Sequence, residues 1–238
     1  MKGDLIYGLR PVVEALRSKR REVREVLDSA GDEEVASEAA IRGVPLKRVR
    51  REHIEELVPG AVHQGVAARV GAYPYSGLEE ILASPDPLVI VLDGVTDPRN
   101  LGAVLRAADG AGASGVVVPK DRAVGVTPAA VKASAGASEH VRVARETNLR
   151  RALERMKEAG VWTYAAEDAA STLATAYTDL DLSGSVALVL GSEGRGVRRL
   201  VREGCDGAVS IPMRGAVSSL NVSVAAAILL FEARRQRG

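Results

Sequence analysis

The chain has 238 residues, a hydrophobic fraction of 46%, a charged fraction of 26% and a formal net charge of +1. These values are ordinary for a globular protein of one or two domains and exclude a disordered or fibrous chain. The near-neutral charge argues against nucleic-acid binding by bulk electrostatics, and the single cysteine, Cys205, excludes an internal disulfide and is typical of a reducing cytoplasm.

The first 70 residues alternate short helical and strand-like patterns and predict a small α/β module. We expect helices at 11–18, 32–41 and 52–58, and strands at 23–27, 44–49 and 65–70. Gly43 is expected to end the second helix, because glycine adopts the left-handed backbone conformation that commonly follows a helix.

Prolines and glycines interrupt this pattern between residues 71 and 87, around one short helix at 78–82. We therefore place a small α/β domain at residues 1–72, a linker at 73–87 and a second domain at 88–238.

From residue 88 onward, apolar runs rich in valine and leucine alternate with helical patterns. The expected strands are 88–93, 115–119, 141–144, 161–165, 186–191 and 208–212, and the expected helices are 101–111, 149–159, 197–203 and one that follows Asn221. This alternation predicts an α/β domain with a parallel sheet covered on both faces. Ligands bind such sheets beyond the carboxyl ends of the strands, which directs attention to three loops.

The first loop follows the strand at 88–93. Asp97 and Pro98 are expected to open a helix as its N-cap and first residue. Leu101, Val104, Leu105 and Ala108 are then spaced to share one buried face, and Arg106 lies off that face. Taken alone, Arg106 is as compatible with a plain surface arginine as with a functional one.

The other two loops are rich in glycine and small polar residues. Gly191-Ser-Glu-Gly-Arg-Gly196 has a spacing that is neither the dinucleotide fingerprint nor a phosphate-binding Walker loop, and it holds Glu193 between glycines. Ile211-Pro-Met-Arg-Gly-Ala-Val-Ser-Ser-Leu-Asn221 leads into the last helix, so N-capping explains at least one of its polar residues. The residues by themselves predict a ligand site built from three strand-end loops.

Together and in this order, the three loops resemble the SpoU/TrmH family of RNA ribose 2′-O-methyltransferases. The matching stretches are Asp97-Pro-Arg-Asn-Leu-Gly-Ala-Val-Leu-Arg106, Leu190-Gly-Ser-Glu-Gly-Arg-Gly196 and Ile211-Pro-Met-Arg-Gly-Ala-Val-Ser-Ser-Leu-Asn-Val-Ser-Val-Ala225. Ile6-Tyr-Gly-Leu9 and His63-Gln-Gly-Val66 look like the RNA-binding domain of the bacterial 23S rRNA guanosine-2′-O-methyltransferase branch. The resemblance covers residues 88–237 and, less specifically, the N-terminal domain.

The resemblance implies a SPOUT domain with a deep trefoil knot, S-adenosyl-L-methionine as methyl donor without a metal, RNA as substrate and a homodimer with active sites near the subunit interface. Periodicity by itself gives no sign of a knot. The apolar last helix is compatible with such an interface or with an ordinary core. The RNA is expected to be ribosomal, with transfer RNA as the alternative.

Motif positions imply roles for individual residues. The residues that correspond to donor-binding positions are Leu190, Gly191, Ile211, Met213, Ser219 and Leu220. The residues that correspond to the catalytic and substrate-positioning set are Asn100, Arg106, Glu193, Ser219 and Asn221. The segment 132–137 also resembles a family segment close to the donor.

Arg106 is the family's usual candidate for activating the ribose hydroxyl, but a guanidinium stays protonated because its pKa exceeds roughly 12. A charged Arg106 can instead hold the adjacent phosphate and stabilise the developing alkoxide. Asn100 and Arg106 are separated by about 240° around an ideal helix, so they cannot share one helix face. We expect Asn100 to reach the site from the loop or the first turn.

Two other classes of protein fit the sequence less well, namely a dinucleotide-dependent enzyme and a non-catalytic RNA-binding protein. A dinucleotide-dependent enzyme would need G-x-G-x-x-G after the first strand, and Gly94-Val-Thr-Asp-Pro98 stands there instead. A non-catalytic RNA-binding protein would have no need for Asn100, Arg106 and Glu193 together. No bilayer-spanning stretch, signal peptide or zinc site is expected, since residues 222–231 are too short and the three histidines lack ligand spacing.

Basic clusters are the first candidates for phosphate contacts, although solvated helix faces explain such runs equally well. They comprise Lys47, Arg48, Arg50 and Arg51, then Arg195, Arg198, Arg199 and Arg202, and finally Arg234, Arg235 and Arg237. With one tryptophan, five tyrosines and one phenylalanine, a base-stacking platform is not expected.

Overall fold

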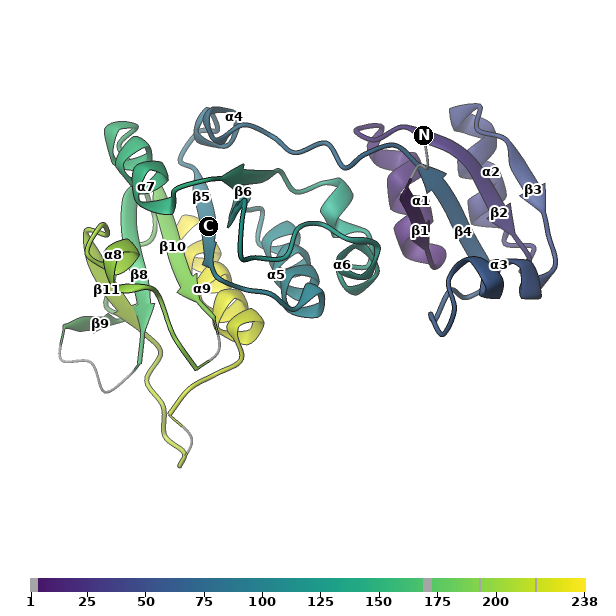
Figure 1. Cartoon of the computed structure of the whole chain (residues 1–238). Helices are drawn as coiled ribbons and strands as arrows, with labels where there is room; N and C mark the ends of the chain where they lie inside the picture. Colours follow the sequence, from purple (N-terminus) through teal and green to yellow (C-terminus); the bar gives the residue numbers. More distant parts are fainter. Residues whose placement is uncertain (1–3, 169–172, 193, 217) are drawn as a thin grey trace.

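The computed structural model describes residues 4–168, 173–192, 194–216 and 218–238, and it has a smaller and a larger lobe joined by an extended segment (Figure 1). The smaller lobe contains β1 (Asp4–Tyr7), α1 (Leu9–Ser18), β2 (Val23–Asp28), α2 (Glu33–Arg42), β3 (Leu46–Arg48), α3 (Arg51–Leu57) and β4 (Val66–Val70). Its sheet has the order β1-β4-β2-β3, with β4 antiparallel to both neighbours and β2 parallel to β3.

Local signals in the smaller lobe act as the sequence predicts. The apolar face of α1 is buried, including Val12, Val13 and Leu16. Helix α2 begins at Asp32, whose side chain accepts the N–H of Val35, and ends at Gly43 in the left-handed conformation. These contacts satisfy backbone groups that a helix terminus would otherwise leave without partners.

The larger lobe is built on a seven-stranded sheet of order β7-β6-β5-β10-β8-β11-β9, in which all pairings are parallel. Its elements are α4 (Leu78–Leu82), β5 (Leu88–Asp93), α5 (Pro98–Gly110), β6 (Gly115–Pro119), α6 (Pro128–Ala133), the 3-10 helix η1 (Ala137–Glu139), β7 (Val143–Glu146), α7 (Leu149–Glu158), β8 (Trp162–Glu167), β9 (Ala174–Ala176), β10 (Val186–Gly191), α8 (Arg199–Arg202), β11 (Gly207–Ser210) and α9 (Val222–Arg237). The predicted α/β class is confirmed.

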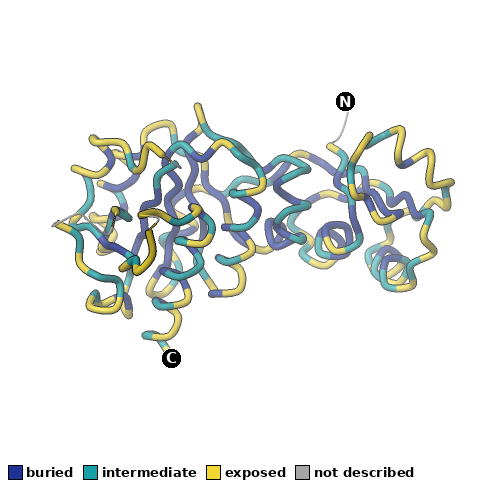
Figure 2. Tube along the Cα trace, turned by 90° about the horizontal axis from the view of Figure 1, so that it is seen from below, coloured by how far each residue is buried: buried dark blue, intermediate teal, exposed yellow. Residues whose placement is uncertain are grey.

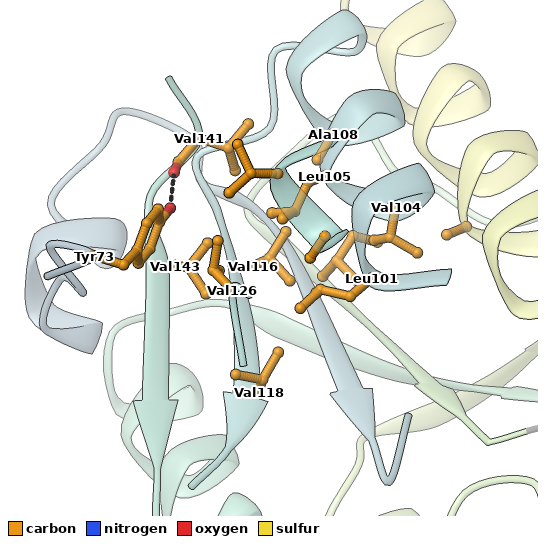
Figure 3. Close-up of a cluster of buried hydrophobic side chains, with 14 of the residues drawn as sticks. Tyr73, Leu101, Val104, Leu105, Ala108, Val116, Val118, Val126, Val141 and Val143 are labelled. Atoms are coloured by element: carbon orange, nitrogen blue, oxygen red, sulfur yellow. Dashed lines mark hydrogen bonds between the residues drawn. The ribbon is translucent and has the colours of Figure 1, made fainter. Parts of the chain in front are cut away.

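Strand β5 shows why this sheet needs helices on both faces. Successive side chains point to opposite faces, so Ile90 packs in the cluster with α5 and α9, whereas Val89 packs in the cluster with α7. Leu101, Leu105 and the rest of the predicted buried face of α5 lie on the first of these faces, against valines of β6 and β7 (Figure 3).

Four short elements, β1, α6, η1 and β9, were not predicted from the sequence. Each has between three and six residues, too few to show a period. The expected strand at 208–212 ends at Ser210 in the structure. Pro212 lacks a backbone N–H and cannot continue a hydrogen-bonded ladder.

The two lobes meet in a buried junction, and buried segments run through both of them (Figure 2). Arg21 donates to Glu139 at 3.2 Å, and both side chains are almost fully buried. Tyr73, in the predicted linker, donates its hydroxyl proton to the carbonyl of Ser138 at 2.6 Å. Burial raises the pKa of Glu139, and the Arg21 guanidinium opposes that rise.

The domain boundaries at residues 72 and 88, and the knot, stay predictions. None of the helices within the described ranges is long and apolar enough to cross a membrane.

Candidate functional site

The ends of β5, β10 and β8, with that of β11, lie at one edge of the sheet, because these neighbouring strands run parallel. The three loops singled out in the sequence follow β5, β10 and β11. Strand pairing therefore gathers segments that are about a hundred residues apart in sequence, as expected for a ligand site of an open α/β sheet.

A cavity of about 740 Å³ opens at this edge, and we call it the strand-end pocket. It has apolar walls from the sheet and α9 and polar groups from the loops. Its lining residues are Ala166, Glu167, Asp168, Leu190, Gly191, Ser192, Gly194, Arg195, Gly196, Val209, Ile211, Met213, Ser218, Ser219, Leu220, Asn221, Val222, Ala225 and Leu229. All six residues expected at donor-binding positions are among them.

Backbone packing shapes the glycine loop of this pocket. A side-chain carbon on Gly191 would overlap the backbone of Gly196, so only glycine allows this close approach. Gly194 and Gly196 have φ of +77° and +61°, values that glycine adopts without strain. The loop is tied to the end of β5, because Arg198 donates its backbone N–H and its Nε–H to the buried Asp93 at 2.8 and 2.7 Å.

Two asparagines join the first and third loops. The side-chain amide of Asn221 donates to Oδ1 of Asn100 at 3.0 Å. Asn221 also caps α9 by accepting the N–H of Ser223 at 2.9 Å, and Asp97 caps α5 by accepting the N–H of Arg99 at 2.8 Å. Asn100 thus reaches the pocket rim from the first turn of α5.

Arg106 lies elsewhere. It lines a second, more open hollow of about 450 Å³, which we call the junction hollow, with Glu14, Asp109, Ser134, Ala135, Ala137 and His140. In this hollow Nε2 of His140 lies 2.8 Å from Oε2 of Glu14, which comes from the smaller lobe. Arg106 is exposed on α5 and makes no hydrogen bond or ion pair with any residue that the structure describes.

The segment 132–137, expected near the donor, is also at the junction. Ser134, Ala135 and Ala137 line the junction hollow, and none of its residues lines the strand-end pocket. Within one chain, then, Asn100, Ser219 and Asn221 come together, whereas Arg106 is apart from them. Glu193 lies outside the described residues.

Two acidic residues that line the strand-end pocket, Glu167 and Asp168, were not predicted from the sequence. They stand at the carboxyl end of β8, where the same strand-end rule could have found them.

Most arginines and lysines of the three basic clusters are paired with carboxylates. Lys47 forms an ion pair with Glu25 at 2.6 Å, and Arg48 forms one with the buried Asp28. Arg202 lies 3.5 Å from the carboxylate of Glu167. Arg198, Arg199 and Arg235 have acidic partners as well. These clusters therefore carry less free positive charge than the sequence suggests.

In the described part of the chain, no three histidine, cysteine or acidic side chains are grouped as a metal site requires.

The pocket and the parallel sheet define a ligand-binding α/β protein, and comparison with known proteins gives its family. Residues 87–231 match the SpoU rRNA Methylase family, and residues 5–76 match the RNA 2'-O ribose methyltransferase substrate binding family. The chain belongs to the SpoU rRNA methylase family.

Its relatives include the 23S rRNA (guanosine-2'-O-)-methyltransferase RlmB of Escherichia coli, which is 43% identical over 98% of this chain and 99% of its own length. RlmB of Shewanella oneidensis is 44% identical over 99% of this chain and 98% of its own length. Both relatives are matched along almost their whole length.

Among solved structures, the AdoMet-bound rRNA methyltransferase from Sinorhizobium meliloti has a TM-score of 0.83 and 28% identity, over 98% of this chain and 87% of that one. The SpoU methyltransferase AviRb from Streptomyces viridochromogenes, in complex with AdoMet, also has a TM-score of 0.83 and 28% identity, over 99% of this chain and 91% of that one. The likeness therefore includes both lobes.

Proposed function

We propose that this protein transfers a methyl group from S-adenosyl-L-methionine to the ribose 2′-hydroxyl of a guanosine in 23S ribosomal RNA. The observation that carries the proposal is the strand-end pocket, which collects all six residues that the family motifs assign to the donor. Relatives that share more than two fifths of their residues with this chain, over nearly its full length, are named for this reaction. Action on ribosomal RNA would place the enzyme in the cytoplasm.

The residues of the strand-end pocket fit such a donor. Leu190, Val209 and Ile211 offer an apolar surface for an adenine ring, and the glycine loop exposes backbone groups that can hydrogen-bond to its edge. Glu167 and Asp168 at the rim provide carboxylates for hydroxyl or cationic groups. When bound there, S-adenosylmethionine would supply an electrophilic methyl group.

The protein's own contribution to methyl transfer is to position the ribose hydroxyl and to stabilise the charge that develops on it. In-line displacement depends on holding the hydroxyl oxygen in place, and Asn100, Ser219 and Asn221 carry polar groups suited to that task. A guanidinium is a poor base, so we assign Arg106 to holding the neighbouring phosphate and stabilising the negative charge that develops on the oxygen. A base other than Arg106 then accepts the hydroxyl proton.

We further propose that the active unit is a homodimer. Arg106 and Asn100 are separated along α5 by about 9 Å and about 240°, which favours Arg106 acting on the strand-end pocket of a second subunit. Val224 and Phe231 lie seven residues apart on α9 and are 46% and 51% exposed, with the partly buried Ala227 and Ile228 between them. This apolar stripe is suited to pack against a second copy.

The test is incubation of the protein with labelled S-adenosylmethionine and total RNA from a strain that lacks the enzyme, followed by mapping of the modified nucleotide. We expect one 2′-O-methylguanosine in 23S RNA. Label found only in transfer RNA would overturn the RNA target, and absence of label in any RNA would favour a binding protein over an enzyme.

A further inference from the structure

Lys132 forms a hydrogen bond that connects the two lobes. It belongs to α6 of the larger lobe, and its ammonium group donates to Oε1 of Gln64 in the smaller lobe at 2.6 Å. The lysine side chain lies across Gly8, where a side-chain carbon would approach the lysine Cδ to 3.1 Å. Gly8, with φ of +100°, thus leaves room for the lysine.

No carboxylate among the described residues neutralises the charge of Lys132. Arg21, another cation at the junction, is buried and paired with Glu139 at 3.2 Å. Arg106 in the junction hollow has no such partner among the described residues, but it is exposed to solvent. Lys132 has no carboxylate within ion-pair distance in the part of the chain that the structure describes. Burial lowers its pKa, and no acidic group offsets that effect. A half-buried ammonium without a counter-charge is costly, and a bound anion would remove that cost.

Gln64 is held in a conformation that favours such a site. Its φ of +56° is uncommon for a residue other than glycine, and its side chain is exposed. The turn is fixed from both sides, because Gly65 donates its N–H to Nδ1 of the buried His63 at 3.1 Å and Val66 donates to the carbonyl of His63 at 3.0 Å. With Oε1 occupied by Lys132, the Gln64 amide keeps its two N–H donors for a ligand. Non-glycine residues with positive φ often mark functional positions.

We propose that Lys132 and Gln64 together bind one backbone phosphate of the RNA substrate at the junction between the lobes. The proposal rests on the proposed function, because it takes the anion to be part of that RNA. An ammonium and an amide N–H are both donors, and a phosphodiester is an acceptor with a full negative charge. One phosphate would then contact both lobes and fix how the smaller lobe presents RNA to the larger one.

Three variants separate this role from a structural one, with the affinity for a 23S RNA fragment as the readout. Lys132→Met removes the charge, and we expect roughly tenfold weaker binding and a salt dependence whose slope is smaller by about one. Gln64→Glu gives Lys132 an acidic partner and strengthens the bridge between the lobes, yet we expect the same loss of affinity because the charge is neutralised. Gln64→Ala keeps the charge and should lose less than either.

A purely structural bridge predicts the opposite order. Gln64→Glu would then bind RNA like the unmodified protein, whereas Gln64→Ala would be as weak as Lys132→Met, and this result would overturn the proposal. Lys157→Met is the matched control, because Lys157 on α7 is paired with Asp206 at 3.0 Å and lies outside both the strand-end pocket and the junction hollow. Thermal unfolding should show that Gln64→Glu is no less stable than the unmodified protein.

Inorganic phosphate distinguishes RNA from a free anion. We expect millimolar phosphate to change the Tm of the unmodified protein and of Lys132→Met equally. Stabilisation of the unmodified protein alone, without a difference in RNA affinity, would assign the site to a free anion and overturn the RNA assignment. RNA affinity is measured apart from methyl transfer. If the unmodified protein is active and Lys132→Met binds RNA with the same affinity, this inference is wrong and the proposed function still stands.

Discussion

Asn221 donates its side-chain amide to Oδ1 of Asn100 at 3.0 Å, across 121 positions of sequence. The same asparagine caps α9 through its own oxygen, which accepts the N–H of Ser223. One side chain therefore sets the start of the last helix and ties it to the first turn of α5. The two motifs that these residues represent meet at the rim of the strand-end pocket.

The two roles of Asn221 can be separated. Asn221→Asp keeps the capping oxygen and loses the N–H that Asn100 accepts, so we expect the free energy of unfolding to change by less than about 1 kcal/mol. Methyl transfer to RNA should fall at least about tenfold, because the loops lose their tie. Asn148→Asp, which alters the cap of α7 in the same way, should retain turnover. Full turnover of Asn221→Asp would remove the tie from the mechanism.

Arg106→Ala should abolish methyl transfer while donor affinity, measured by calorimetry, stays within about twofold. The reason is that Arg106 lines the junction hollow, is absent from the wall of the strand-end pocket of its own chain, and is assigned to the RNA phosphate and not to the donor. Arg151→Ala, on the exposed side of α7, serves as control. A parallel collapse of donor affinity would contradict this division of roles.

Gly191→Ala should weaken donor binding at least about tenfold, because the added carbon would overlap the backbone of Gly196 and force the loop apart. Gly215→Ala is the matched change in the third loop, where a side-chain carbon meets nothing within 4 Å. Calorimetric titration of both variants with S-adenosylmethionine checks the prediction. Equal affinities of the two variants for S-adenosylmethionine would show that the glycine loop accommodates the added carbon without loss of donor binding.

Phe231→Asp should convert the proposed dimer into monomers in analytical ultracentrifugation and abolish methyl transfer. A charge on the apolar stripe of α9 would be buried without a partner in the dimer. Ile41→Asp changes a residue that is 74% exposed in the smaller lobe and should leave the oligomeric state unchanged. A monomer before any substitution would refute the dimer itself.

Cys205 should be almost unreactive toward thiol reagents in the folded protein. Burial raises its pKa to about 12, so folding disfavours the thiolate, and the thiolate fraction at pH 8 should be lower than in the unfolded chain by roughly a thousandfold. The prediction is checked by the rate of reaction with a chromogenic disulfide with and without urea. Since the folded pKa is raised, thiolate formation opposes folding only as the pH rises above about 8.5. Rapid labelling of the folded protein would contradict the burial of this thiol.

Sequence patterns predicted the parts of the fold that have long or strongly apolar signals. The bounds of β5, β6 and β10 were predicted to the residue, because strands buried on both faces are continuous apolar runs between polar turns. Segments such as β9 and α6 carry no such signal, since their form depends on the neighbours against which they pack.

For the site, local patterns were enough to identify the residue types that stand at the strand ends, because glycine, asparagine and capping residues act through local backbone geometry. Which of these residues come into contact depends on the packing of the whole chain. Parallel strand pairing brought the loops after β5, β10 and β11 to one pocket, while the path of α5 carried Arg106 to the junction between the lobes. The contact of Lys132 with Gln64 joins residues 68 positions apart and has no counterpart in any local pattern, because it forms only where the two lobes pack together.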